Sequence, residues 1–261
     1  MAEDPFEGIR QKLIRAEKHF ADVLGILHTF NKGHCKLIPE RDEDLDALVL
    51  RVVLNPKGSP KLSAVIGDFL FAVRCVLDHL VCAMALRCGH LITDKHMFPI
   101  TSTPAKFVDA VRRHRLGGLP AEAQAIIEGL QPHAGRNEPL RWLDSLHNTD
   151  KHRTLNVTTI ASMHTHFVWG DGGHQIVLGS EELRDGAKLP IGVPLSNPMF
   201  TTLVDRLYKV KVEGECALFV AFEELAGESE DLEPFGVALV LHEISEFVRC
   251  SVLPNLYPFL N

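Results

Sequence analysis

The chain has 261 residues, of which 46% are hydrophobic and 23% charged, so it has the composition of a globular protein large enough to bury a core. Its formal net charge of −7 excludes a broad DNA-binding surface, because affinity for nucleic acid depends largely on Lys and Arg. A short basic run at residues 112–115 is typical of a solvated helix end, although it leaves room for a local anion site.

The composition also predicts a cytoplasmic protein that is not inserted in a membrane. The first residues are acidic and are not followed by the apolar segment of a signal peptide. The most apolar stretch, residues 64–86, contains Asp68, Arg74, Asp78 and His79, and a membrane span rarely holds four such groups. The 6 cysteines are scattered, which is typical of reduced thiols in a cytosol.

Apolar residues at three- and four-residue steps predict helices in the first half of the chain and at its end. The expected helices are residues 5–30, 63–88, 104–114, 120–130, 138–148 and 235–252. Ser63 is the expected N-cap of the second helix, and Pro254 is expected to end the last one. The second helix is apolar around nearly its whole circumference, which predicts a buried central position.

The sequence between the expected helices has the pattern of β-strands. Residues 35–54, with a valine-rich run at 45–54, predict a strand or hairpin, although the leucines leave a short helix as an alternative. Short apolar runs separated by glycines follow residue 153, and further β-like runs are expected at residues 208–212 and 217–223. We therefore expect a single α+β domain over residues 1–261, in which a helical bundle surrounds a buried central helix and the C-terminal half contributes most of an antiparallel sheet. A subdivision into a mainly helical part, 1–153, and a β-rich part with a C-terminal helix, 154–261, also fits this pattern.

Charged residues on the expected central helix need partners, because an unpaired ion in the interior costs several kcal/mol. Arg74 and Asp78 are four residues apart and can pair along the helix. His79 lies about 100° further round, near the line of Cys75 and Cys82. A metal on these two cysteines and His79 is an alternative to simple burial of the thiols.

Arg74 and His79 form an R-x4-H pattern that resembles the motif of the HEPN superfamily, which comprises helical bundles that bind nucleotides or cleave RNA without a metal. The resemblance implies an RNA- or nucleotide-binding protein, acting as a homodimer and without a cofactor. It further implies that Arg74 stabilises a phosphate and His79 transfers protons, with Asp78 beside them. It covers only the helix at residues 63–88.

The chain also resembles a family of uncharacterised bacterial proteins that carry L-D-H-L, F-P-I and D-K-H-R elements in this order. Here they are residues 77–80, 98–100 and 150–153. That resemblance implies no established activity.

A second polar cluster follows the helix expected at residues 138–148. Its candidate substrate-binding residues are His147, Asp150, Lys151, His152 and Arg153. In the first interpretation they bind RNA or a nucleotide next to His79.

Two other interpretations remain open. Three histidines and a carboxylate, His79, His147, His152 and Asp150, also suit a metal-dependent hydrolase. In the remaining interpretation the protein is a non-catalytic binding module, and Asp150 and Arg153 cap a helix end and pair with Arg74 or Asp78 in a buried polar network.

Overall fold

The computed structural model describes residues 5–30, 35–44, 46–54, 60–153, 155, 157–169, 174–178, 182–183, 186, 188–194, 215–222, 225 and 236–260. By internal packing the chain forms two compact units. The first comprises Met1–Gly25, Ser59–Asn156 and Phe222–Asn261, and the second comprises Ile26–Gly58 and Val157–Ala221. The prediction of one domain over the whole chain stays a prediction.

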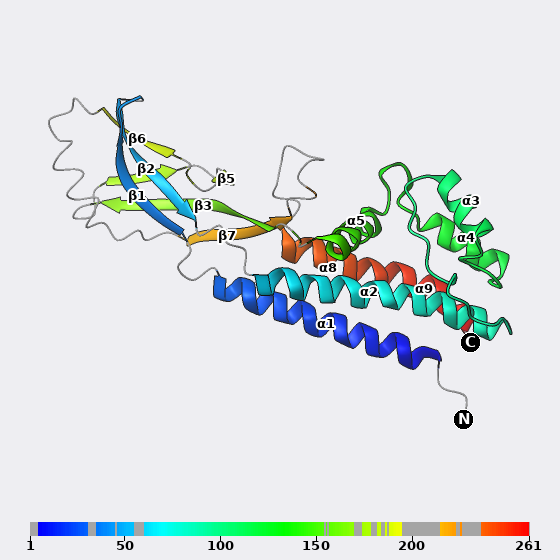
Figure 1. Cartoon of the computed structure of the whole chain (residues 1–261). Coiled ribbons are helices and arrows are strands. Elements are labelled where there is room, and N and C mark those ends of the chain that lie inside the picture. The colour runs from blue at the N-terminus through cyan, green and yellow to red at the C-terminus, as the bar shows by residue number, and fades with distance from the viewer. Residues whose placement is uncertain are drawn as a thin grey trace. The chain divides into compact units, whose positions relative to one another are not determined.

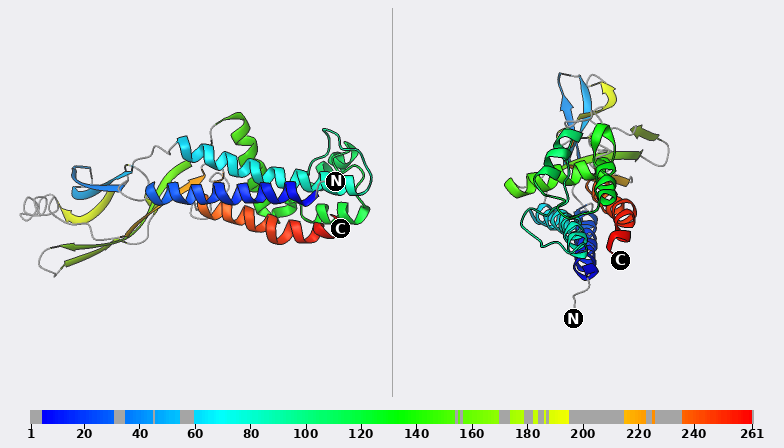
Figure 2. Two further views of the ribbon diagram at one scale, coloured as in Figure 1. Left: turned by 90° about the horizontal axis from the view of Figure 1, so that it is seen from below. Right: turned by 90° about the vertical axis from the view of Figure 1, so that its right-hand side faces the viewer.

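The first unit is a helical bundle, as predicted. Its helices are α1 (Pro5–Phe30, which belongs to this unit up to Gly25), α2 (Pro60–Arg87), α3 (Pro104–Arg112), α4 (Ala121–Gly129), α5 (Glu138–His152), α8 (Val237–Phe247) and α9 (Leu253–Leu256). Short 3-10 turns lie at His133–Gly135 and Tyr257–Leu260. In two directions of view α1, α2 and α8 run side by side (Figures 1 and 2).

The core of this unit lies where α1 and α8 pack on α2. Ile9, Ala16 and Val23 recur at seven-residue steps on α1 and are buried. The Phe20 ring lies 6.0 Å from the Phe69 ring of α2 and 6.3 Å from the His242 ring of α8, measured between centroids. The predicted central helix is therefore confirmed, and helices near both ends of the chain complete its packing.

The helix α2 is buried on most of its surface but not on all of it. Among the described residues it is the one helix long and apolar enough to cross a membrane, and 61% of its most apolar stretch is buried inside the structure. Asp68, Phe71 and His79 lie on an exposed face. Two of the polar residues that interrupt the apolar pattern, Asp68 and His79, therefore lie on the exposed side of α2, whereas Arg74 is only 12% exposed.

Two predicted helix boundaries are wrong. Ser63 is not an N-cap, because α2 begins at Pro60, where a proline suits the first turn. The buried Ser63 hydroxyl instead donates a hydrogen bond to the Leu155 carbonyl, at 3.0 Å. Pro254 does not end the last helix: a π-helical turn, Val248–Val252, follows α8 and leads into α9, where Pro254 occupies the first turn.

The second unit consists of strands. The expected hairpin corresponds to β1 (Cys35–Asp42) and β2 (Ala47–Leu54), which pair antiparallel from Cys35 opposite Leu54 to Asp42 opposite Ala47. β6 (Lys188–Pro194) pairs with β2. In a separate sheet, β3 (Val157–Trp169) pairs with β4 (His174–Leu178), β5 (Glu182–Leu183) and β7 (Glu215–Phe222). A β-like run expected at residues 208–212 lies outside the described residues.

Candidate functional site

Arg74 and Asp78 of α2 form a clamp on the backbone of Phe98. The Arg74 guanidinium donates from Nη2 to Asp78 Oδ1, at 3.1 Å, and also to the Phe98 carbonyl. Asp78 Oδ1 in turn accepts the Phe98 N–H, at 2.9 Å. The two side chains are 12% and 33% exposed, and the Phe98 side chain is fully buried. The L-D-H-L and F-P-I elements therefore meet in the structure, through the backbone of one residue.

The segment after Phe98 is fastened a second time by Gln131, which is buried at the end of α4. Gln131 Oε1 accepts the Thr101 N–H at 2.8 Å and the Thr101 hydroxyl at 3.1 Å. Its amide nitrogen donates to the carbonyls of Pro99, at 2.8 Å, and Ile127, at 3.0 Å. Because these polar groups of Gln131 are paired, the network rigidifies residues 98–101 without leaving an unmet hydrogen bond.

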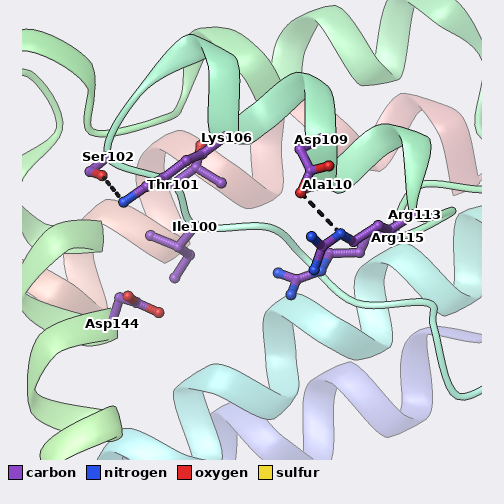
Figure 3. Close-up of a pocket in the computed structure, with 9 residues that line it drawn as sticks. All are labelled: Ile100, Thr101, Ser102, Lys106, Asp109, Ala110, Arg113, Arg115 and Asp144. Atoms are coloured by element: carbon purple, nitrogen blue, oxygen red, sulfur yellow. Dashed lines mark hydrogen bonds and ion pairs between the residues drawn. The ribbon is translucent and has the colours of Figure 1, made fainter.

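This fastened segment forms one wall of a cavity of about 280 Å³ (Figure 3). The other walls come from α3, from the turn that follows it, and from α5. The lining residues are Ile100, Thr101, Ser102, Lys106, Asp109, Ala110, Arg113, Arg115 and Asp144.

Cations predominate in the cavity, and they differ in how they are paired. Lys106 donates from Nζ to the Ser102 hydroxyl, at 3.0 Å. Arg113 pairs with Asp109, at 2.9 Å, and both side chains are largely exposed. Arg115 is half-buried and has no side-chain hydrogen bond or ion pair among the described residues. Its guanidinium fork is therefore free to bind a planar anionic group.

Asp144 projects from α5 into the same cavity, on the side away from Arg113 and Arg115 (Figure 3). Burial raises its pKa, against the opposing effects of the Arg74 charge, a hydrogen bond from Asn148 and the charges of Lys151 and Arg115. Arg74 thus acts on the cavity in two ways, by holding its wall and by its charge.

No family model matches this chain, and no curated protein and no solved structure is significantly similar to it.

The structure does not bring His79 to the cavity. His79 is exposed and lies against α1, where a Cβ added to Gly8 would come within 2.8 Å of its Nδ1. Arg74, from the same helix, is held at Phe98. The two residues of the R-x4-H pattern therefore have different surroundings within one chain.

His147 is the buried member of the second cluster. It is 5% exposed, and its Nε2 has no hydrogen-bond partner among the described residues. Its ring lies 6.4 Å from the Phe71 ring, between centroids. Burial, helped by the charges of Lys151 and Arg74, lowers its pKa to about 4. The imidazole is therefore neutral at physiological pH.

The D-K-H-R element is the last turn of α5 and its C-cap, and not a segment that follows the helix. Lys151, His152 and Arg153 are exposed. The Asp150 carboxylate lies close to Gly67 of α2. Burial and the charge of Asp68 raise the pKa of Asp150.

Arg153 caps the end of α5, as expected. The expected pairing of Asp150 or Arg153 with Arg74 or Asp78 is wrong: among the described residues, Arg74 and Asp78 bind each other and the backbone of Phe98, and neither binds Asp150 or Arg153. At this point Gly67, which has no Cβ, leaves room for the Asp150 carboxylate close to the backbone of α2.

The histidines and carboxylate proposed for a metal do not form a cluster. Among the described residues no three His, Cys, Asp or Glu side chains are grouped so that they could hold a metal ion. Burial raises the pKa of both Cys75 and Cys82, which disfavours the thiolate that a soft metal needs. The geometry therefore gives no support to either metal interpretation.

Replacement of Gly67 by alanine tests the contact with Asp150. The new Cβ would lie 2.5 Å from Asp150 Oδ2, so we expect the free energy of unfolding to fall by about 1–2 kcal/mol. In an Asp150→Ala background the same replacement should instead stabilise the protein by up to about 1 kcal/mol, because alanine favours helix over glycine. Equal effects in the two backgrounds, measured by urea unfolding, would show that the residues are not in contact.

Sequence patterns do not predict most of the residues that line the cavity. The basic run at residues 112–115 was a usable signal, since two of its members line the cavity, and the F-P-I element supplies Ile100. Lys106 and Asp144 carry no pattern that distinguishes them from other charged helix residues.

Proposed function

We propose that the helical unit binds a phosphate-bearing ligand, a nucleotide or the phosphate of an RNA end, in the cavity between residues 100–102, α3 and α5. The proposal depends on one observation: the Arg115 guanidinium, which has no side-chain hydrogen bond or ion pair in the part of the chain that the structure describes, faces a cavity that also holds Lys106 and Arg113. It keeps the binding part of the expectation drawn from the sequence and moves it from His79 and residues 147–153 to the residues that line this cavity.

The chemistry of the walls supports an anion. Two guanidinium groups and an ammonium group supply many N–H donors, and the guanidinium fork matches phosphate oxygens in pairs. Ser102 adds a hydroxyl that can donate to a ligand while it accepts from Lys106. The wall is rigid because Gln131 and the Arg74–Asp78 clamp fix its backbone, so little conformational entropy is lost on binding.

The size of the cavity supports a small ligand. Its volume of about 280 Å³ is at the lower end of the range for small-molecule sites. A phosphate with an attached sugar fits that scale better than an RNA helix, whose contacts would extend over a broad basic surface that a net charge of −7 does not favour.

The ribonuclease mechanism and the homodimer stay predictions that follow from the R-x4-H resemblance. Within one chain, Arg74 is engaged by Asp78 and by the Phe98 carbonyl, so it would have to leave both to bind a phosphate. Cleavage of a mixed RNA pool that persists in EDTA and disappears in His79→Ala would support the mechanism. We also propose an α+β architecture for the whole chain, supported by the antiparallel pairing of β1 with β2 and of β3 with β4.

Titration with inorganic phosphate tests the proposed site. We expect Arg115→Gln to weaken binding at least tenfold, or about 1.4 kcal/mol, because it removes a guanidinium group that lines the cavity. Arg112→Gln is the matched control: it removes the same charge from the exposed last residue of α3, which does not line the cavity. Equal losses in both variants, or no binding by the unmodified protein, would contradict the proposal.

A further inference from the structure

We propose that Asp144 makes the cavity selective for phosphates that carry a hydroxyl or amine donor on an attached group, such as a sugar phosphate or nucleotide, over phosphate alone. This inference depends on the proposed function, because it names the class of ligand for the same cavity.

The arrangement of charge in the cavity is the first argument. Asp144 lies on the α5 wall, across from Arg113 and Arg115 (Figure 3). A ligand that places its phosphate against the guanidinium groups would therefore direct its remaining part toward a carboxyl group. Apart from the hydrogen bond from Asn148, Asp144 makes no hydrogen bond or ion pair among the described residues, so its oxygens retain capacity to accept.

A carboxylate in an anion site also carries an energetic cost. An ionised Asp144 repels phosphate and reduces affinity for any ligand that offers nothing in return. A hydroxyl or amine donor that reaches Asp144 offsets this cost, whereas an apolar group of the same size leaves the carboxylate desolvated and unpaired. Asp144 therefore disfavours phosphates without such a donor and favours phosphates that carry one.

The second carboxylate in the cavity provides a contrast. Asp109 pairs with Arg113 at 2.9 Å, one helical turn along the chain, and is more than half exposed. The ion pair with Arg113 therefore accounts for the presence of Asp109. If Asp144 served only to neutralise positive charge, replacing either carboxylate would have the same effect on every anionic ligand.

The experiment measures dissociation constants calorimetrically for three probes: inorganic phosphate, butyl phosphate and ribose 5-phosphate. For the unmodified protein we expect ribose 5-phosphate to bind about tenfold more tightly than the other two. In Asp144→Ala this preference should fall to less than about threefold, while inorganic phosphate binds as well as before or more tightly. In the control, Asp109→Ala, all three affinities should change together and the preference should persist.

The outcomes separate the two proposals. Equal affinity for the three probes in the unmodified protein, or an unchanged preference in Asp144→Ala, would overturn the role of Asp144 and leave the phosphate site in place. Absence of binding by all three probes would overturn the proposed function and this inference with it. Because Asp144→Ala can lower stability through Asn148, Asp144→Asn provides a second variant, in which inorganic phosphate should bind more tightly than to the unmodified protein.

Discussion

Asp78→Ala is expected to lower the free energy of unfolding by about 2–3 kcal/mol. The replacement leaves the Arg74 guanidinium, which is 12% exposed, without its carboxylate partner, and it removes the acceptor of the Phe98 N–H. The loss is smaller than for a fully buried ion pair because Asp78 itself is 33% exposed. Phosphate affinity should fall in parallel, since the same clamp holds the backbone of Phe98, two residues before the cavity wall begins at Ile100. Urea unfolding and phosphate titration of the one variant measure the two effects.

Two controls separate loss of the clamp from loss of a charge. His79→Ala removes the neighbouring exposed side chain of the same helix and should change stability by less than about 0.5 kcal/mol. In the double variant Arg74→Met, Asp78→Leu no ion is left unpaired, so it should be more stable than Asp78→Ala alone. A double variant that is less stable than the single one would show that the ion pair is not what makes Asp78 important.

His147 is expected to make the protein less stable in mild acid. Its pKa is about 4 in the folded chain and about 6.5 in an unfolded one, so below pH 6.5 the unfolded state takes up a proton that the folded state does not. This effect does not lower the free energy of unfolding above pH 6.5. The free energy of unfolding falls progressively as the pH drops below 6.5, and the loss reaches its full size below about pH 4. By pH 5 the loss amounts to about 2 kcal/mol.

The comparison with His147→Gln isolates this effect. The raised pKa values of Asp144 and Asp150 favour the folded state as the pH falls, and so oppose His147 in part of the same window. Both carboxyl groups titrate in both proteins, so their contributions cancel in the difference. We expect the stability advantage of the unmodified protein over His147→Gln to shrink by about 2 kcal/mol between pH 7.5 and pH 5. A difference that does not vary with pH would mean that water reaches the imidazole.

The helices could be predicted because their signals are local. Seven-residue spacing of buried side chains on α1 and the long apolar run of α2 are visible in the sequence and correspond to observed elements. The errors at Ser63 and Pro254 have physical causes. A serine can satisfy its hydroxyl at Leu155, far along the chain, and a π-helical turn can accommodate a proline that would otherwise end a helix.

The site was harder to predict because its partners are backbone groups or distant residues. Pairing of Arg74 with Asp78 follows from a four-residue spacing, but no pattern indicates that both would bind Phe98, twenty residues beyond Asp78. The approach of Asp150 to Gly67 likewise depends on how α2 and α5 pack. Charge and apolar periodicity identify which residues are unusual, and tertiary packing decides what they touch.

The fastening of residues 98–101 has a consequence for engineering. Asp78 and Arg74 bind the main chain of Phe98, and Gln131 binds the main chain of Pro99 and Thr101 as well as the Thr101 hydroxyl. The side chains of Ile100 and Ser102, which face the cavity, take no part in this fastening. Residues 100 and 102 are therefore positions at which the lining can be varied while its frame is retained, and a library at these two positions offers a direct route to new ligand preferences.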